Sequence, residues 1–322
     1  MWRNPMKREH EILFSTFKLG RYEMRSRVVV PPMVQRRPIT SKEGIAWYKR
    51  LAATGAGLVI VEATGVTRFP KKLTAKKMRA LADAIHKEGA LAAIQLLPLD
   101  DVSVKFDVNA FTKDEIAAIY GRYAKAAEVC RDAGFEGVEP HGAHNYLINQ
   151  FFMPDKNKRT DEYGGSLENR SKFGVEIVKA IKDAVGDSIL ILYRHTPEGE
   201  AYTVEDSLKL AGKLIAAGVD VLDISPAKKE ITAALAAPFK KTFKVPVIAV
   251  GGMNDPDAAA DALHNGRCDL AAIGRAFIAD PDFLKKVREE RFADIIQCKK
   301  CKGCLNLIFQ GKKAVCVQGA SK

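Results

Sequence analysis

Two histidines and a tyrosine stand close enough in the sequence to carry acid–base chemistry together. The stretch EPHGAHNYL places His141 three residues before His144, and Tyr146 follows two residues later. Imidazole and phenol groups donate hydrogen bonds and exchange protons, which are the properties that general acid–base catalysis requires. A histidine at a strand end is also a common structural group, so the residue types alone leave the role of this trio open.

Four of the six cysteines gather near the C-terminus at the spacing C-x₂-C-x₂-C-x₁₁-C. They are Cys298, Cys301, Cys304 and Cys316. The N-terminal stretch MWRNPMKREHEIL lacks the apolar core of a secretory signal, so four close thiols favour a metal site over disulfides. Thiolates at this spacing bind zinc or an iron–sulfur cluster, and the spacing leaves both possibilities open. The other two, Cys130 and Cys268, are isolated, and we expect each to fill a small buried space.

The composition is that of a globular enzyme. Of the 322 residues, 47% are hydrophobic and 28% are charged. No apolar run approaches the roughly 18 residues of a membrane span, so we expect no such span and a cytoplasmic location. The net charge is +12, but no helix-turn-helix signature or interleaving of aromatic and basic residues accompanies the lysines. We therefore expect a solvated basic surface and no nucleic-acid partner.

Eight short apolar runs, separated by amphipathic stretches, predict a parallel sheet covered by helices. The runs are residues 27–33, 57–63, 91–97, 137–140, 188–194, 219–225, 245–252 and 269–275. Two of the intervening segments, 113–134 and 204–218, end on a glycine that suits a helix C-cap. Eight such units within about 250 residues favour an α/β fold of the TIM (β/α)₈ type. We predict a barrel over residues 1–292 and a short cysteine-rich appendage over residues 293–322.

The ends of the predicted strands carry polar residues and glycines where a TIM barrel places its active site. Gly251 and Gly252 end the seventh run, and Gly274 and Arg275 end the eighth. This corner of the barrel is its usual phosphate site. Glycine leaves backbone N–H groups open to a ligand, and a guanidinium pairs with a dianion. The two glycine-containing ends therefore indicate a phosphate-binding site.

The chain resembles the Old Yellow Enzyme family of FMN-dependent oxidoreductases from about residue 10 to residue 316. The most specific block is residues 139–170, which are similar to the family motifs H-G-A-H-G-Y-L and N-x-R-T-D-E-Y-G-G-S-x-E-N-R. The stretch VIAVGGMNDPDAAADALHNGRCDLAAIGRAFIADP is similar to the phosphate-binding half of the family. The resemblance implies a TIM barrel, FMN as cofactor, and reduction of an activated C=C bond in an enone or enoyl compound.

The resemblance also implies which residues contact the flavin. Gln95 and Arg194 would hydrogen-bond its pyrimidine edge, where Arg194 would favour the reduced cofactor by its positive charge. The phosphate would be held by Gly251, Gly252, Gly274 and Arg275, and the other flavin surfaces would be lined by Pro32, Met33 and Ala63.

The same resemblance implies catalytic roles for the trio. His141 and His144 match the pair that binds the activating oxygen of the substrate, where two N–H donors stabilise negative charge. Tyr146 matches the phenol that gives a proton to the α-carbon while hydride passes from flavin N5 to the β-carbon. The charged residues that follow would form a salt-bridged loop at the barrel mouth; they are Arg159, Asp161, Glu162 and Arg170.

Four positions depart from the family pattern. Val34 stands where a hydroxyl or thiol usually hydrogen-bonds the flavin, which valine cannot do. Asn145 and Pro226 replace glycines, and Pro98 replaces a histidine at the start of a loop that is much shorter than usual. Because long loops at a barrel mouth often wall the active site, we expect an open site that admits a bulky or extended substrate.

Within the family, the cysteine spacing resembles that of the 2,4-dienoyl-CoA reductase and trimethylamine dehydrogenase group, which implies a [4Fe–4S] cluster. No GxGxxG motif follows a predicted strand and the chain ends six residues after Cys316, so we expect a separate electron donor. Six lysines and no acidic residue lie between Gln297 and the end, which suits an acidic ferredoxin or flavodoxin.

Three other functions remain open at this point. One is an ene-reductase that takes hydride directly from NAD(P)H, with cysteines that bind zinc or nothing. Another is an oxidative flavoenzyme that resembles an amine dehydrogenase. The last is an electron-transfer subunit with an inactive pocket, although such a subunit would have no use for His141, His144 and Tyr146.

Overall fold

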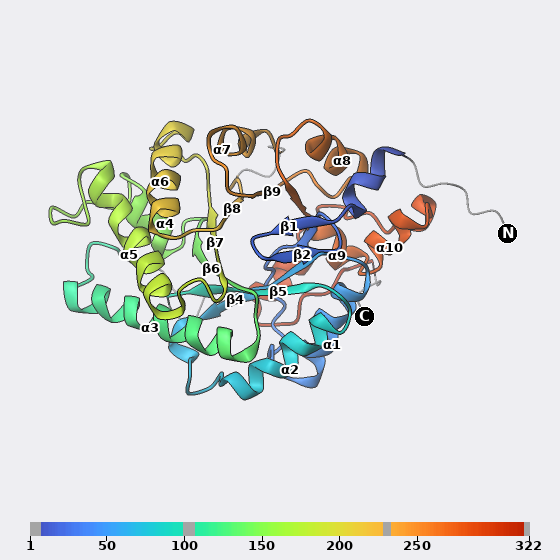
Figure 1. Ribbon diagram of the computed structural model, residues 1–322, viewed down its shortest axis with the longest axis horizontal. Coiled ribbons are helices and arrows are strands. Elements are labelled where there is room, and N and C mark those ends of the chain that lie inside the picture. The colour runs from blue at the N-terminus through green and yellow to red at the C-terminus, as the bar shows by residue number, and fades with distance from the viewer. Residues whose placement is uncertain (1–7, 99–106, 228–232, 319–322) are drawn as a thin grey trace.

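The fold is a closed barrel of eight parallel strands (Figure 1). A computed structural model describes residues 8–98, 107–227 and 233–318. The barrel strands, in their order around it, are β10 (Leu270–Ala272), β3 (Val28–Val30), β4 (Leu58–Gly65), β5 (Leu91–Leu97), β6 (Gly137–Gly142), β7 (Leu190–His195), β8 (Val221–Ile224) and β9 (Val247–Val250). Each of the eight predicted runs overlaps one barrel strand, although β4, β6 and β7 extend one or two residues beyond their runs, so the predicted TIM barrel is confirmed.

Helices surround the barrel, and further short helices and turns accompany them. The surrounding helices are α1 (Lys42–Ala53), α2 (Ala75–His86), α3 (Lys113–Ala133), α5 (Leu167–Val185), α6 (Val204–Ala217), α7 (Ala237–Thr242) and α8 (Pro256–His264). The additional short elements are α4 (Leu147–Phe152), α9 (Arg275–Ala279), α10 (Phe283–Arg288) and α11 (Gly303–Phe309), with 3-10 turns η1 (Arg8–Phe14), η2 (Val66–Arg68), η3 (Ala233–Leu235) and η4 (Phe292–Asp294). None of the described helices is both long enough and apolar enough to cross a membrane.

The caps that the sequence predicts for α3 and α6 are present. Thr112 and Glu115 form a capping box at the start of α3, and Gly134 ends the helix in the left-handed conformation at φ 92°. Gly218 ends α6 in the same way at φ 119°. Glycine adopts this backbone without the penalty that a Cβ atom would bring, which is why both helices stop there.

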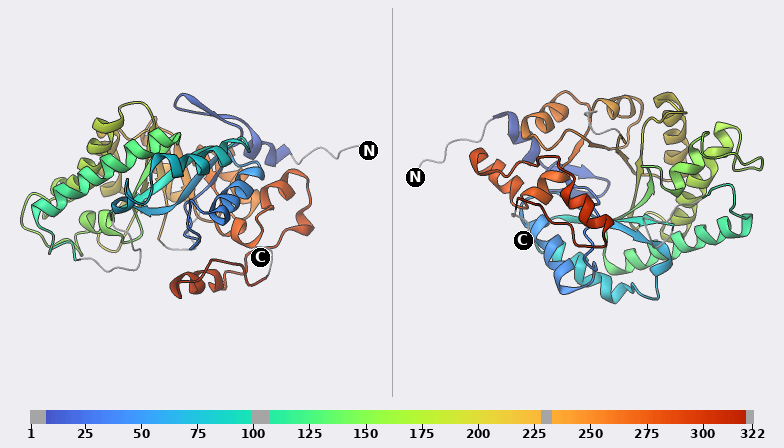
Figure 2. Two further views of the ribbon diagram at one scale, coloured as in Figure 1. Left: turned by 90° about the horizontal axis from the view of Figure 1, so that it is seen from below. Right: turned by 180° about the vertical axis from the view of Figure 1, so that it is seen from behind.

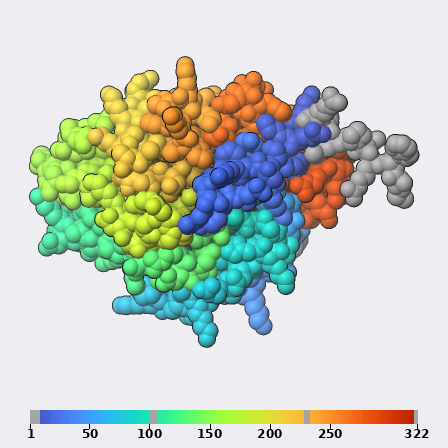
Figure 3. Space-filling view, in the orientation of Figure 1, coloured from blue at the N-terminus to red at the C-terminus, as the bar shows by residue number. Residues whose placement is uncertain are grey.

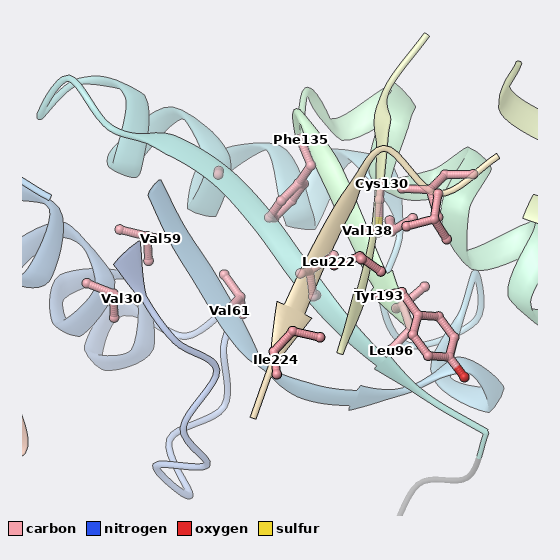
Figure 4. Packing of buried hydrophobic residues seen from close by; sticks show 14 of the residues in the cluster. Val30, Val59, Val61, Leu96, Cys130, Phe135, Val138, Tyr193, Leu222 and Ile224 are labelled. Carbon is pink, nitrogen blue, oxygen red and sulfur yellow. The ribbon is translucent and has the colours of Figure 1, made fainter. Parts of the chain in front are cut away.

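Alternate residues of most strands pack into two separate apolar layers. On β4, Val59 and Val61 face the helices, and Leu58 and Ile60 face the barrel interior. Figure 4 shows the helix-facing layer, which also contains Cys130. Because both faces of the sheet are buried, its strands read as continuous apolar runs. Cys130 and Cys268 are both buried, as predicted.

A short antiparallel hairpin, which the sequence analysis does not foresee, covers one end of the barrel. It consists of β1 (Phe17–Leu19) and β2 (Tyr22–Met24). Leu19 and Met24 are fully buried against the interior layer of the barrel, and the hairpin lies across the face seen in Figures 1 and 3. The C-terminal segment lies across the opposite end (Figure 2). With one end covered by the hairpin, the functional residues collect at the other. The boundary between residues 292 and 293 stays a prediction.

Candidate active site

The two histidines and the tyrosine come together at the carboxyl end of β6. His141 is on the strand itself, and Tyr146 is the residue that precedes the first turn of α4. The ring centroids of His141 and His144 are 5.3 Å apart, and those of His141 and Tyr146 are 4.9 Å apart. The three side chains therefore form one cluster, as the sequence predicts.

A tight turn between the strand and α4 brings the cluster together. His144 and Asn145 both have positive φ, at 58° and 61°, which few residues other than glycine adopt readily. Asparagine tolerates this conformation better than most residues, which explains how Asn145 can replace the usual glycine. The turn is held by hydrogen bonds from the His144 N–H to Thr196 Oγ1 and from the Asn145 N–H to Asn149 Oδ1, both 2.9 Å.

Burial keeps both imidazoles neutral. It is the largest cause that lowers the pKa of His144 to about 3, and the charge of Arg194 adds to it. Burial also lowers the pKa of His141 well below its ordinary value, with the neighbouring His144 and Arg194 as further causes. His144 Nε2 lies 2.9 Å from Ser225 Oγ. At neutral pH the two rings can therefore act as uncharged hydrogen-bond donors.

Tyr146 keeps its proton at neutral pH, because burial raises the pKa of its phenol. A protonated phenol beside two neutral imidazoles can donate both hydrogen bonds and a proton. The arrangement suits a substrate that gains negative charge on one atom and a proton on another.

Arg194 on β7 presents unused hydrogen-bond donors beside this cluster. Its side chain is buried, and Nη2 donates to Ser225 Oγ at 2.9 Å. Its Nε and Nη1 groups are buried and find no hydrogen-bond partner within the described ranges. Buried donors without partners are costly, so a ligand with acceptors at this point would satisfy them. The pyrimidine edge of a flavin supplies such acceptors, and the site therefore fits FMN.

One cavity of about 450 Å³ joins the cluster to the cysteine segment. Among the predicted site residues, it is lined by Met33, His144, Tyr146, Arg194, Gly251, Arg275, Cys298, Cys301, Cys304 and Cys316. The predicted departures Val34 and Pro226 also line it. The structure thus brings predicted substrate, flavin and thiolate positions around a single space.

Other predicted residues do not line this cavity. They are Pro32, Ala63, Gln95, His141, Gly252 and Gly274. Gly252 instead lines a neighbouring cavity of about 730 Å³, together with Asn254 and Arg275. Gly251 and Gly252 have φ values of 111° and 75°, and the Ala276 N–H at the start of α9 donates to Asn254 Oδ1 at 3.0 Å. Arg275 therefore stands between the two cavities, at the corner where the sequence predicts a phosphate.

A further cavity of about 540 Å³ opens beside the first one. It shares His144, Pro226 and Ala227 with the cavity of about 450 Å³, and it extends from there to Tyr202 and Lys156. The short loop on which the prediction of an open site rests lies mostly at residues 99–106, outside the described residues. The neighbouring cavity nevertheless gives room for a larger molecule next to His144.

The charged loop after α4 is a salt-bridged scaffold, as predicted. Arg159 pairs with both carboxylate oxygens of Asp161, and its Nη1 donates to the carbonyl oxygens of Val108 and Phe111 at 2.9 and 2.7 Å. Glu162 pairs with Lys113 at 2.7 Å. Arg170, which the sequence analysis places in the same loop, lies instead on α5, where its guanidinium donates to the carbonyl oxygens of Phe152 and Gly165.

The four cysteines form no disulfide bond with one another, and all four line the cavity. Within the described part of the chain, no three His, Cys, Asp or Glu side chains are placed so that they could hold a metal ion. Burial raises the pKa of the Cys304 thiol, and the neighbouring Cys298 and Cys301 contribute. Lys300 and Lys302, which alternate with the cysteines, have positive φ values of 56° and 61°. The iron–sulfur cluster stays a prediction.

Three polar residues of the site were not predicted from the sequence. Ser225 contacts both His144 and Arg194, and Glu139 and Asp223 are fully buried beside Arg194. The available signal was alternation, because Glu139 precedes His141 by two residues and Asp223 precedes Ser225 by two. Residues two apart on a strand share a face.

In this TIM barrel the imidazole of His144, the phenol of Tyr146 and the guanidinium of Arg194 line one cavity, and His141 packs against the first two. The sequence pattern of the NADH:flavin oxidoreductase / NADH oxidase family matches residues 101–294. The chain belongs to this family, the Old Yellow Enzyme family.

Individual relatives agree with this membership. The chain is 32% identical to an NADH oxidase of Thermoanaerobacter brockii over 94% of its own length and 55% of that protein. It is 32% identical to putative 12-oxophytodienoate reductase 4 of Oryza sativa subsp. japonica, over 85% of each chain. A solved complex of 2-naphthoyl-CoA reductase with 2-naphthoyl-CoA superposes with a TM-score of 0.86 at 26% identity, covering 95% of this chain and 56% of that one. The chain spans about half the length of the curated relatives that match nearly all of it.

Proposed function

We propose that this protein reduces the C=C bond of a small molecule in which the bond is conjugated to a carbonyl or a similar electron-withdrawing group. The observation that carries the proposal is the meeting of two neutral imidazoles and a protonated phenol beside the unpaired donors of Arg194. FMN, when bound, supplies the hydride. The protein supplies the binding of the oxygen and the proton.

In this proposal the histidines and the tyrosine act on different atoms of the substrate. His141 and His144 donate N–H hydrogen bonds to the activating oxygen, which becomes more negative as the β-carbon gains hydride. Neutral donors fixed in a water-poor site stabilise that charge without a rearrangement of their own. Tyr146 then gives its proton to the α-carbon, so the substrate gains one hydride and one proton in total.

We propose that Gln95, Arg194 and the surrounding residues hold the flavin as the resemblance implies. Arg194 has two donors without a hydrogen-bond partner among the described residues, and Arg275, Gly251 and Gly252 line the two cavities. Met33 and Gly251 line the cavity between these two points. Pro32, Ala63 and Gly274 would contact the cofactor from the ends of the neighbouring strands.

The cysteine segment is proposed to carry a [4Fe–4S] cluster. A zinc ion requires its sulfur ligands to converge at about 2.3 Å on one point, and the described thiols do not converge. A cluster takes its thiolates on separate irons, so they surround a space as the four cysteines do around the cavity. The positive φ of Lys300 and Lys302 is a strained backbone of the kind that persists where a site requires it.

Electrons are proposed to enter through this segment from an acidic carrier such as a ferredoxin or flavodoxin. Lys299, Lys300, Lys302 and Lys312 are exposed, and no acidic residue lies between Gln297 and Lys322. Opposite charges speed encounter and weaken with salt. The competing donor is NAD(P)H acting directly at the barrel. Flavin reduction by ferredoxin that slows as salt is added supports the carrier, and rapid reduction by NADH alone supports the alternative.

The substrate is proposed to be bulky or extended. The cavity beside His144 offers room beyond the reacting atoms, and the solved relative with the high TM-score is a complex with 2-naphthoyl-CoA. If this is correct, an extended enoyl compound reacts faster than cyclohexenone. Faster turnover of the small enone would contradict it.

A pair of half-reactions tests the proposed direction of catalysis. The FMN-loaded protein is reduced without oxygen and mixed with a panel of enones and enoyl thioesters, while the flavin absorbance is followed. An ene-reductase is reoxidised by these compounds. An amine dehydrogenase instead becomes reduced when the oxidised protein is mixed with amines, so bleaching by amines and no response to enones would overturn the proposal.

A further inference from the structure

Two carboxyl groups are buried together behind Arg194, and neither belongs to the proposed chemistry. Glu139 on β6 and Asp223 on β8 have 0% exposed surface. The strands that carry them flank β7, and the pairing register places Asp223 opposite Arg194. Gln95 on β5 is opposite Glu139 and donates to its Oε1 at 2.7 Å. Four neighbouring strands thus contribute one amide, two carboxyls and one guanidinium to a single buried group.

If both acids are ionised, this buried group has more hydrogen-bond acceptors than donors. Glu139 Oε2 and both carboxylate oxygens of Asp223 are buried and have no hydrogen-bond donor among the residues the structure describes. Arg194 Nη1 is 3.5 Å from Asp223 Oδ2, beyond the usual 2.7–3.2 Å of an N–H···O bond. The strands that carry the two acids lie on either side of β7, and each acid shifts the pKa of the other. A proton on one carboxyl is the donor that the group lacks.

Charge balance leads to the same conclusion. Two ionised carboxylates and one guanidinium would leave a net negative charge fully out of water, and like charges in one site do not both ionise readily. The other titratable groups that face this group, His141 and His144, are neutral and offer no compensation. One shared proton leaves one negative charge, which Arg194 balances.

We propose that Glu139 and Asp223 share a single proton and that the resulting singly charged pair positions Gln95 and Arg194 for the cofactor. The first half depends only on the contacts around the two acids. The second half rests on the proposed contacts of Gln95 and Arg194 with FMN. Both acids are positioning residues, because they reach the cofactor only through those two side chains.

The directions of the pKa shifts agree with the shared proton. Burial is the largest cause that raises the pKa of Glu139 well above its ordinary value, and the charge of Asp223 is the next. Burial also raises the pKa of Asp223, although Arg194 opposes the rise. Protons on such a pair belong to both groups together.

Infrared spectroscopy of the FMN-free protein tests the proton directly. Among the other described carboxyl groups, the one whose pKa is strongly raised is Glu62, at about 7. At pH 9 this group is ionised and does not contribute to the band. We expect the C=O stretch of one protonated carboxylic acid in the wild type. Glu139→Gln and Asp223→Asn should each abolish the band, because each leaves one acid that Arg194 keeps ionised, and Glu62→Gln should leave it. A wild type without the band, or a band that survives both substitutions, overturns the shared proton.

The midpoint potential of bound FMN tests the positioning role. Each single substitution keeps one negative charge beside Arg194, so we expect the ratio of reduced to oxidised flavin at a fixed potential to change less than threefold. The double substitution Glu139→Gln/Asp223→Asn leaves Arg194 uncompensated and should raise that ratio at least tenfold. Suppose that the wild type shows the infrared band but the double variant has an unchanged ratio of reduced to oxidised flavin. This result would overturn the positioning role and leave the shared proton standing. The proposed reduction of a C=C bond is tested separately, by the reoxidation of reduced flavin with enones and enoyl thioesters.

Discussion

The backbone N–H of Ala314 donates a hydrogen bond to the carbonyl oxygen of Gln35, at an N···O distance of 3.1 Å. This bond joins the cysteine segment to the loop that follows β3, which also carries Met33. Arg37 strengthens the junction, because its Nη1 donates to the Ala314 carbonyl oxygen at 3.1 Å and its guanidinium packs over Trp47. The position of the thiols relative to the active-site cavity is therefore set by the barrel itself.

Replacing Arg37 with alanine should loosen this junction and leave the barrel folded. Arg37 is 8% exposed, so its loss removes a buried contact that holds Ala314 of the cysteine segment in place. We expect limited proteolysis to cut this segment several times faster, with little change in far-ultraviolet circular dichroism. Arg50→Ala is the matched control, since Arg50 makes only an exposed ion pair with Asp282 at 3.2 Å. Equal cleavage rates in the Arg37 and Arg50 variants would contradict the assignment.

Glu62 should make stability depend on pH between about 4.5 and 7. Burial raises the pKa of this carboxyl to about 7, although the Gln35 N–H and nearby arginines oppose the rise. Between the two values the folded chain binds the proton and the unfolded chain releases it, so stability falls as pH rises through this window and is level above it. The loss amounts to about 3 kcal/mol.

Denaturant unfolding at pH 5 and pH 8 checks this effect. Glu62→Gln cannot titrate, so its free energy of unfolding should change less with pH than that of the wild type. The difference between the two proteins isolates Glu62 from the other acids. A wild type and variant with parallel pH profiles would show that the carboxyl is ionised throughout.

Because the two histidines are neutral, their ionisation should not affect the dependence of activity on pH near neutrality. With the pKa of His144 at about 3 and that of His141 well below its usual range, kcat/KM for an enone should show no histidine step between pH 5 and pH 8. Loss of one fixed donor costs about 10²–10³-fold in rate, so His144→Ala should fall by that amount. His264→Ala, at an exposed histidine whose ring lies 3.0 Å from the Glu9 carbonyl oxygen, should be unchanged. A step near pH 6.5 that disappears in His144→Ala would show a charged imidazole instead.

The sequence was sufficient for the barrel because each strand is buried on both faces and so reads as an unbroken apolar run. The hairpin β1–β2 was not predicted because its strands are only three residues long, and its two fully buried residues, Leu19 and Met24, fit no periodic pattern. Its position depends on the open end of a barrel that forms from residues far along the chain.

The site shows the same division between local and long-range information. His141, His144 and Tyr146 are neighbours in sequence and were predicted as a group. Ser225, which contacts His144 from 81 residues away, could not be placed before the strand register was known. The acids at positions 139 and 223 looked like ordinary polar residues, and only the barrel brings them to the same guanidinium.

The four clustered cysteines should bind iron and sulfide together. Protein purified without oxygen should contain about four irons and four sulfides per flavin, as one [4Fe–4S] cluster requires. Cys304→Ser should lower the iron content severalfold, while the buried and isolated Cys268→Ser should leave it unchanged. Flavin without iron, with or without zinc, would contradict the cluster and favour NAD(P)H as the direct donor.

Replacing Tyr146 with phenylalanine should separate the two halves of the catalytic cycle. The phenol is proposed to protonate the α-carbon, a step that occurs only when the reduced enzyme meets its substrate. Loss of a general acid costs about 10²–10⁴-fold, so reoxidation of the flavin by an enone should slow by that amount. Reduction of the flavin by its donor does not involve this proton and should keep its rate. An electron-transfer subunit would be unaffected in both halves, and slower flavin reduction in the variant would mean that Tyr146 serves the cofactor instead of the substrate.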